Sequence, residues 1–133
     1  MAEENKFDLK VITPERIFYE DSVDMVEFNT VEGEVGILKG HIPMSMVIAP
    51  GILTITKDGE PKNAALHAGF VEVLPNQVSI LAEVVEWPTE IDKDRAEAAK
   101  DRAETRIREA APGTDMARAD LALRRAVARI NVL

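Results

Sequence analysis

The pattern of apolar residues changes once along this chain, close to residue 91, and that change restricts the possible folds more than any other feature. Residues 1–90 contain short runs in which apolar and polar residues alternate, separated by Gly and Pro. Such alternation is typical of β-strands, whereas residues 91–133 carry Ala and Arg at helical spacing. We therefore expect a mainly β fold with added α-helices: an N-terminal antiparallel sandwich or barrel over residues 1–87, then a C-terminal antiparallel two-helix hairpin over residues 88–133.

Turn residues divide the N-terminal part into short strands. The Asp-Gly pair at residues 58–59 favours a type I′ hairpin turn, and residues 75–77 are expected to form a second tight turn. Between these and other Gly and Pro positions, we expect strands at residues 7–12, 22–30, 44–48, 52–56, 64–73 and 78–85.

Two helices are expected after Trp87. Either Thr89 or Asp92 can cap the first one, and the Pro-Gly pair at residues 112–113 separates it from the second, which Thr114 or Asp115 can cap. The first helix offers mainly alanines for packing, and alanines bury little area, so the hairpin should be only weakly held. The second helix carries an apolar stripe made of Met116, Ala119, Leu123, Ala126, Val127 and Ile130.

Composition limits the possible functions. The 133 residues allow one domain, or one domain with an appendage, and 46% hydrophobic content supports a folded core. There is no cysteine, which excludes disulfides and thiolate chemistry. No apolar run approaches the ~20 residues of a spanning helix, and the polar, acidic residues 1–6 are no secretory signal, so a cytosolic protein is the simplest interpretation.

Charge is distributed unevenly over a net value of −8. Residues 1–90 contain 6 basic and 16 acidic residues, whereas residues 91–133 contain 10 basic and 8 acidic residues. The acidic first part argues against a nucleic-acid-binding surface, which needs a basic footprint. The basic tail is compatible either with an anionic partner or with a solvated helix laced with ion pairs.

Four arginines of the tail are spaced so that they can meet. Arg95 and Arg102 are two helical turns apart and share a face, as do Arg125 and Arg129, which are four residues apart. Folding the hairpin brings Arg95 level with Arg129 and Arg102 level with Arg125. Four guanidiniums along one seam repel each other unless an anion such as a polyphosphate binds between them.

Neighbouring residues could complete such a site. Ile91 could pack against a planar ring, Asp92 could accept a hydrogen bond from an amino group, and Glu86 is close in sequence. The alternative is that these arginines are solvated or paired with carboxylates of their own helices.

No pattern in the chain indicates an active site. The serines lie in no nucleophile-elbow motif, and the glycines form neither a dinucleotide fingerprint nor a phosphate loop. The two histidines, His41 and His67, have no carboxylate at metal-ligand spacing and are interpreted as structural or solvated. We therefore expect no catalytic residue and no metal site.

One long stretch carries a family resemblance. Residues 32–43 read EGEVGILKGHIP, which resembles a characteristic stretch of the F-type ATP synthase epsilon subunit family. The resemblance extends in register over nearly the whole chain, and includes Leu9, Val11, residues 13–16, Pro50-Gly51 and residues 69–73. It implies a flattened β-sandwich followed by a two-helix domain, in a subunit that catalyses nothing.

The resemblance also implies partners and a role. It implies a central-stalk (rotor) subunit at the cytoplasmic face of the cell membrane, peripheral and without membrane insertion, which couples gamma to the c-ring in proton-driven ATP synthesis. The hairpin would lie folded on the sandwich, or extend along gamma into the alpha/beta catalytic hexamer and inhibit ATP hydrolysis. No nucleic acid is expected as a partner. The c-ring contact implied by the family falls on Glu32, Gly33, Glu34 and His41.

Some bacterial members of the family bind ATP through a motif that is present here. The motif falls on Ile91, Asp92, Arg95 and Ala96, and the other positions of the same site fall on Glu86, Arg102, Arg125 and Arg129. The resemblance therefore implies ATP as a regulatory ligand, with no cofactor required. A freestanding nucleotide-sensing module without a rotary partner is the alternative function.

Overall fold

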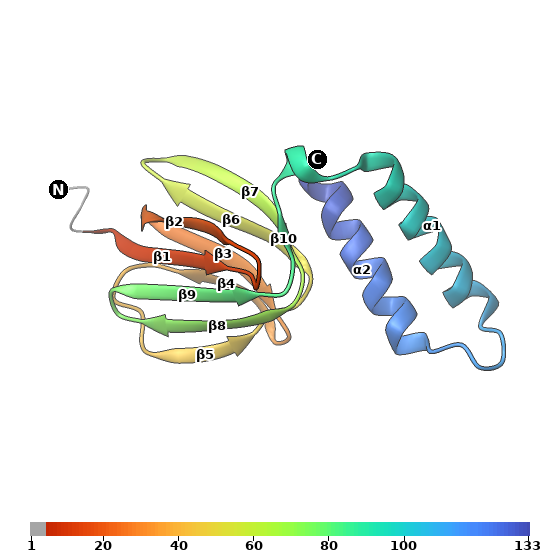
Figure 1. Cartoon of the computed structure of the whole chain (residues 1–133). Coiled ribbons are helices and arrows are strands. Elements are labelled where there is room, and N and C mark those ends of the chain that lie inside the picture. Colours follow the sequence, from red (N-terminus) through yellow and green to blue (C-terminus); the bar gives the residue numbers. More distant parts are fainter. Residues whose placement is uncertain (1–4) are drawn as a thin grey trace.

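The computed structural model describes residues 5–133, which form a β-sandwich with a helical hairpin at one end (Figure 1). Residues 1–4, which include most of the acidic N-terminal segment and the start of the expected first domain, lie outside the described residues. The predicted order of a sandwich followed by a two-helix hairpin is confirmed.

Ten strands form two five-stranded sheets. The first sheet contains, in order, β2 (Ile17–Val23), β1 (Phe7–Ile12), β9 (Gln77–Ala82), β8 (Gly69–Leu74) and β5 (Met44–Val47). The second contains β10 (Val85–Glu86), β7 (Glu60–Leu66), β6 (Gly51–Lys57), β3 (Met25–Thr30) and β4 (Gly33–Ile37). The pairs are antiparallel except β1 with β9, which run parallel. No tight turn joins these two strands, so no hairpin imposes an antiparallel direction on them.

The core lies between the two sheets. In several strands, such as β1, β3, β8 and β9, every second residue is buried, because successive side chains of a strand point to opposite faces. The largest side chains that are fully buried include Leu9 of β1, Phe28 of β3, Leu53 and Ile55 of β6, and Ile80 of β9. This alternation is the pattern that predicted the strands.

Three predicted strand ranges are wrong, because the chain changes sheet within each of them. Residues 22–30 divide at Asp24 into the end of β2, which was not predicted, and β3. Residues 64–73 divide into β7 and β8, which belong to different sheets. Gly69 allows this crossing, since its φ is +135° and an added Cβ would lie 2.0 Å from the carbonyl oxygen of Leu81.

A second crossing runs beside the first. Residues 83–84 connect β9 to the short β10, so the predicted strand at residues 78–85 is also divided. The His67 amide donates to the Val84 carbonyl at 3.1 Å, and the Glu83 amide donates to the Ala68 carbonyl at 2.8 Å. These bonds hold the two crossings together at the corner from which the hairpin departs.

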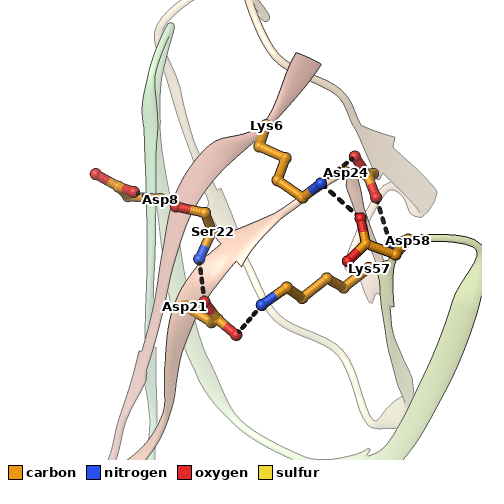
Figure 2. Close-up of polar contacts among 7 residues, drawn as sticks. All are labelled: Lys6, Asp8, Asp21, Ser22, Asp24, Lys57 and Asp58. Carbon is orange, nitrogen blue, oxygen red and sulfur yellow. Dashed lines mark hydrogen bonds and ion pairs between the residues drawn. The ribbon is translucent and has the colours of Figure 1, made fainter. Parts of the chain in front are cut away.

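The opposite end of the sandwich is tied by charged side chains (Figure 2). Lys6 Nζ lies 2.7 Å from Asp58 Oδ1 and 3.6 Å from Asp24 Oδ1, and Lys57 Nζ lies 2.6 Å from Asp21 Oδ2. Asp58 has a φ of +52°, as the predicted type I′ turn between β6 and β7 requires. We call these five residues the distal network.

The hairpin consists of α1 (Lys93–Glu109) and α2 (Met116–Val132), preceded by a 3-10 turn, η2 (Pro88–Glu90). Asp92 caps α1 by accepting a hydrogen bond from the Arg95 amide, and Asp115 caps α2 in the same way. Of the alternative caps, these two are therefore the ones used. Trp87 packs at the junction as a structural residue, with its ring stacked on Phe18 at a centroid distance of 4.3 Å.

The hairpin contacts the sandwich through α2. The C-terminal part of α2 lies against β6 and β7, while the loop that joins the helices points away from the sandwich (Figure 1). The predicted apolar stripe is wrong at one position, since Met116 lies near that loop and is 42% exposed. The buried residues of the hairpin are all alanines: Ala96, Ala103, Ala119, Ala126 and Ala128.

Candidate functional site

A cavity of about 390 Å³ opens where the sandwich, η2 and both helices meet. Its walls come from one continuous stretch of chain, which runs from β10 through η2 into α1, and from α2, which is distant in sequence. Its lining residues are Glu86, Glu90, Ile91, Asp92, Arg95, Ala96, Ala99, Arg102 and Arg129. The cavity therefore exists only when the hairpin is folded and docked on the sandwich.

The structure brings together seven of the eight residues expected at the nucleotide site. Of the predicted set, only Arg125 does not line the cavity. It lies one helical turn before Arg129 on α2, and its Nε atom is buried without a hydrogen-bond partner among residues 5–133. Glu90 and Ala99 line the cavity but were not predicted, because Glu90 belongs to η2, whose turn the sequence did not reveal, and Ala99 has no polar group to mark it.

Local structure explains how the cationic side chains are placed. The Asp92 carboxylate accepts the Arg95 amide at 3.1 Å, which sets the first turn of α1 and directs Arg95 and Ala96 towards the cavity. Arg102 follows two turns later on the same face. Because α2 runs antiparallel to α1, its last turn returns Arg129 to the level of Arg95.

Glu86 is the carboxylate that links the sandwich to α2. Its Oε1 atom accepts a hydrogen bond from Arg129 Nε at 2.7 Å, and lies 3.3 Å from His67 Nε2. The Arg129 and Glu86 side chains are 30% and 26% exposed, so this ion pair is partly shielded from water. Glu86 is therefore already engaged by the protein and is not free to neutralise a second cation.

His67 was interpreted as structural or solvated, and it is in fact buried, with 1% exposure. Burial and, after it, the charge of Arg129 lower the pKa of His67 from 6.5 to about 4. The sequence gives one signal that could have indicated burial, namely that His67 follows three apolar residues at the end of β7.

The cavity is lined by three arginines and three carboxylates, but two of the arginines are not paired with any of these carboxylates. The guanidiniums of Arg95 and Arg102 make no ion pair or hydrogen bond to any side chain between residues 5 and 133. Glu90 does not compensate them, because it accepts two hydrogen bonds from Arg16 Nη2, at 2.7 and 2.9 Å. A hydrogen bond from the Trp87 amide and then the contact with Arg16 lower the pKa of Glu90, which keeps it ionised in that pair. The arrangement suits an anion with several oxygens.

Local pairing, the alternative interpretation of the tail, applies to other residues. Arg124 pairs with Asp120 at 3.1 Å, and Lys100 pairs with Glu104 at 3.6 Å, both within one helix. None of these four lines the cavity. The basic tail thus contains basic residues that are ion-paired within one helix, and also unpaired arginines that line the cavity.

The residues expected at the c-ring contact do not form one cluster along the chain. Glu32 lies in the turn before β4, and Gly33 and Glu34 begin that strand. His41 lies beyond the other end of β4, where its Nδ1 atom is 2.8 Å from the Ile42 carbonyl oxygen. The first three are exposed and His41 is half-buried.

A larger groove of about 710 Å³ separates the C-terminal part of α2 from β3, β4 and β6. Amide and charged side chains line it together with Leu123, Val127 and Ala128 of α2. No unpaired cationic cluster faces it, since Arg124 is paired with Asp120. We take the groove as a sign that α2 packs incompletely against the sheet.

Among residues 5–133, no group of three or more His, Cys, Asp or Glu side chains is arranged to hold a metal ion. Neither helix of the described chain is both long and apolar enough to cross a membrane.

Comparison with known protein families gives a consistent match over both parts of the chain. The beta-sandwich domain of the ATP synthase delta/epsilon chain family matches residues 6–88. The long alpha-helix domain of the same family matches residues 89–133.

Similar proteins carry related names. The chain is 43% identical to the ATP synthase epsilon chain of Caldicellulosiruptor saccharolyticus, over 96% of this chain and 93% of that one. It is 46% identical to the ATP synthase epsilon chain of Halalkalibacterium halodurans, over 93% and 94% of the two chains.

Two solved structures share the fold. A chain of the Euglena gracilis mitochondrial ATP synthase, solved with OSCP, F1 and the c-ring, aligns with a TM-score of 0.77 at 22% identity, over 90% of this chain and 76% of that one. A chain from the central stalk and c-ring of the Tetrahymena thermophila mitochondrial enzyme aligns with a TM-score of 0.58 at 16% identity, over 95% and 92%.

Proposed function

The chain belongs to the ATP synthase delta/epsilon chain family, and from this premise we propose that its hairpin is an ATP-controlled switch on the central stalk of that enzyme. The chain is a non-catalytic subunit of an F-type ATP synthase. In our proposal it is peripheral, lies at the cytoplasmic face of the cell membrane, and couples gamma to the c-ring during proton-driven ATP synthesis.

One observation carries the proposed switch. The unpaired guanidiniums of Arg95 and Arg102 on α1 face the same cavity as Arg129 on α2 and Glu86 on β10. Phosphate oxygens placed among these groups would accept charge-assisted hydrogen bonds and reduce the repulsion between the arginines. Ile91 and Ala96 give the cavity an apolar wall against which the base could pack.

The mechanism follows from where the cavity lies. ATP can contact both helices and the sandwich only while the hairpin is docked, so ATP binding favours the docked form by mass action. When ATP falls, the arginines lose their counter-charge, and the weakly packed hairpin can open. The released hairpin then extends along gamma towards the catalytic hexamer, where it inhibits ATP hydrolysis.

Calorimetric titration of the full chain with ATP tests this proposal. We expect saturable one-to-one binding, and we expect Arg95→Ala to weaken it by about ten- to a hundredfold, because it removes charge-assisted hydrogen bonds of about 1.5–3 kcal/mol. Arg108→Ala is the matched control, since Arg108 lies on the same helix, outside the cavity, and bonds Thr105.

No binding by the wild type would overturn the ATP switch while leaving the stalk role in place. Equal loss of affinity in both variants would mean that ATP responds to the general charge of α1 and not to the cavity.

The sandwich offers two kinds of surface for the stalk partners. We assign the c-ring contact to residues at the two ends of β4, namely Glu32, Gly33, Glu34 and His41. Three of them are polar, and Gly33 has a positive φ of +126°. The outer face of β5 and β8 exposes Val47, Phe70 and Leu74, and exposed apolar residues of this kind suit a protein partner such as gamma. Co-purification with gamma separates the stalk role from a freestanding nucleotide sensor.

A further inference from the structure

A buried histidine connects the sandwich to the docked hairpin. His67 lies at the crossing between β7 and β8, and its Nε2 atom is 3.3 Å from Glu86 Oε1. The same oxygen accepts the 2.7 Å hydrogen bond from Arg129 Nε. His67, Glu86 and Arg129 therefore form a continuous row from the sandwich core, through the wall of the cavity, to the last turns of α2.

We propose that His67 is a positioning residue that makes docking of α2 depend on pH. As a neutral imidazole it donates from Nε2 to Glu86 and holds that carboxylate against Arg129, whereas as an imidazolium it favours release of the hairpin. The inference rests on the proposed function and deepens it, because Glu86 and Arg129 line the cavity assigned to ATP.

The geometry makes protonation unfavourable in the docked form. The Nδ1 atom of His67 is buried and has no hydrogen-bond partner among residues 5–133. A proton on Nδ1 would therefore create a buried donor without an acceptor, which costs free energy. In the neutral tautomer that donates from Nε2, Nδ1 is an unpaired acceptor, which also costs free energy but places no charge in the buried site, so protonation is the more costly state.

The surrounding charges act in the same direction. The charged groups that face His67 are Glu86 from β10 and Arg125 and Arg129 from α2. Two of these are cations, and the one carboxylate is already engaged by Arg129. An imidazolium would add a third positive charge to this cluster. Burial and the arginines accordingly lower the pKa of His67 to about 4.

Release of the hairpin removes the two cations of α2, Arg125 and Arg129, from the surroundings of His67. In our proposal the pKa of His67 then rises towards its ordinary value of 6.5. Because the docked form binds the proton less readily, docking is strongest above that pH. The docking constant is expected to fall about tenfold for each pH unit between 6.5 and 4, and to lose nothing more to His67 at lower pH.

Energy transfer between two labels on the full chain measures docking without any nucleotide. The chain has no cysteine, so Glu60→Cys on β7 and Ala122→Cys on α2, both at exposed positions, provide unique labelling sites. Enough urea is added to bring the docked fraction near one half at pH 7.5. On acidification to pH 5.5, we expect the docking constant of the otherwise wild-type chain to fall about tenfold.

His67→Gln is the decisive variant, because its side-chain amide can donate to Glu86 but does not titrate. We expect its docked fraction to equal that of the wild type at pH 7.5 and to stay unchanged at pH 5.5. His67→Leu lacks the donor and should dock severalfold more weakly at pH 7.5. The inference is overturned if the wild type shows no change between the two pH values, or if His67→Gln shows the same change as the wild type.

Repeating the measurement with ATP separates this inference from the proposed function. Phosphate groups of ATP titrate too, so the relevant quantity is the difference between the pH profiles of the wild type and His67→Gln. ATP binding with identical profiles overturns the inference and leaves the ATP switch intact. A His67-dependent change in docking, in a chain that binds no ATP, supports the inference and overturns the ATP switch.

Discussion

The sandwich and the hairpin are held by different kinds of side chain. The sandwich buries large residues such as Phe28, Leu53 and Ile80 between its sheets, whereas the buried residues of the hairpin are alanines. At about 25 cal/mol per Å² of apolar surface, a buried alanine contributes far less than a buried leucine. The sandwich is therefore stable through its own core, while the position of the hairpin depends on small buried side chains and on few polar contacts. A weakly held element is suited to act as a switch.

Truncation of a core leucine should give the largest effect and should be confined to the sandwich. Leu53→Ala removes a side chain that is 0% exposed, and we expect a loss of about 2–5 kcal/mol in the free energy of unfolding. Urea unfolding followed by circular dichroism measures it. In α1, Ala103→Gly should cost only about 1 kcal/mol, from helix propensity, and should leave the sandwich transition unchanged. If both variants shift the same single transition, the two parts unfold together and the sandwich is not stable independently of the hairpin.

Overpacking the interface should affect docking without weakening the sandwich. Ala128 borders the groove beside β6 but is only 4% exposed, so the added atoms of Ala128→Leu are expected to push α2 away from the sheet and to weaken docking by about 1–3 kcal/mol. The labelled chain described above reports the docked fraction. Ala117→Leu, on the exposed surface of the same helix, is the control and should dock normally. An unchanged docked fraction in Ala128→Leu would mean that the interface has room for a larger side chain.

The partly shielded ion pair should matter more than the exposed ones. Arg129→Gln breaks the 2.7 Å contact with Glu86 and should weaken docking by about 1–2 kcal/mol. Arg124→Gln breaks the exposed pair with Asp120, four residues away on the same helix, and should cost about 0.3–0.5 kcal/mol or less. Measuring both in the labelled chain at low and high salt gives a further check, since salt screens the exposed pair more strongly. Equal effects of the two variants would contradict the special role of the Glu86 contact.

The hairpin was easier to predict from the sequence than the sandwich. Helix ends follow from local chemistry, so Asp92, Asp115 and the Pro-Gly break were all among the predicted boundaries. Strand ends at Asp24 and Gly69 depend on where the chain leaves one sheet for the other, which is a property of distant partners. For this reason β2 was not predicted as a strand of its own, although most strands were predicted from their alternating residues.

The difference between local patterns and contacts of distant segments also explains which features of the candidate site were predicted. Helical spacing and antiparallel packing are regular, so they predicted that Arg95, Arg102 and Arg129 would approach one another. The pairing of Glu90 with Arg16 and the burial of His67 against Glu86 join segments that no periodic rule relates. These long-range contacts decide which charges in the cavity are already neutralised, and the sequence alone did not reveal them.

Acid should weaken the docking of the hairpin at a higher pH than it weakens the sandwich. The loss of stability in the sandwich should also be the smaller of the two effects. In the distal network (Figure 2), hydrogen bonds from Lys6 and Lys57 lower the pKa values of Asp58 and Asp21 below the ordinary value of 3.8. A carboxylate with a lowered pKa in the folded state contributes its full stability above its unfolded pKa and loses it as the pH falls. These side chains are at the surface, so the loss should be modest. Urea midpoints of the sandwich should therefore be nearly constant from pH 7 to pH 5 and decline below pH 4, with a weaker decline in Lys6→Met.

Docking of α2, which we propose depends on His67, should already weaken between pH 6.5 and pH 5. A sandwich that loses stability over that same higher range would mean that protonation of His67 acts on the whole fold and not on the hairpin alone.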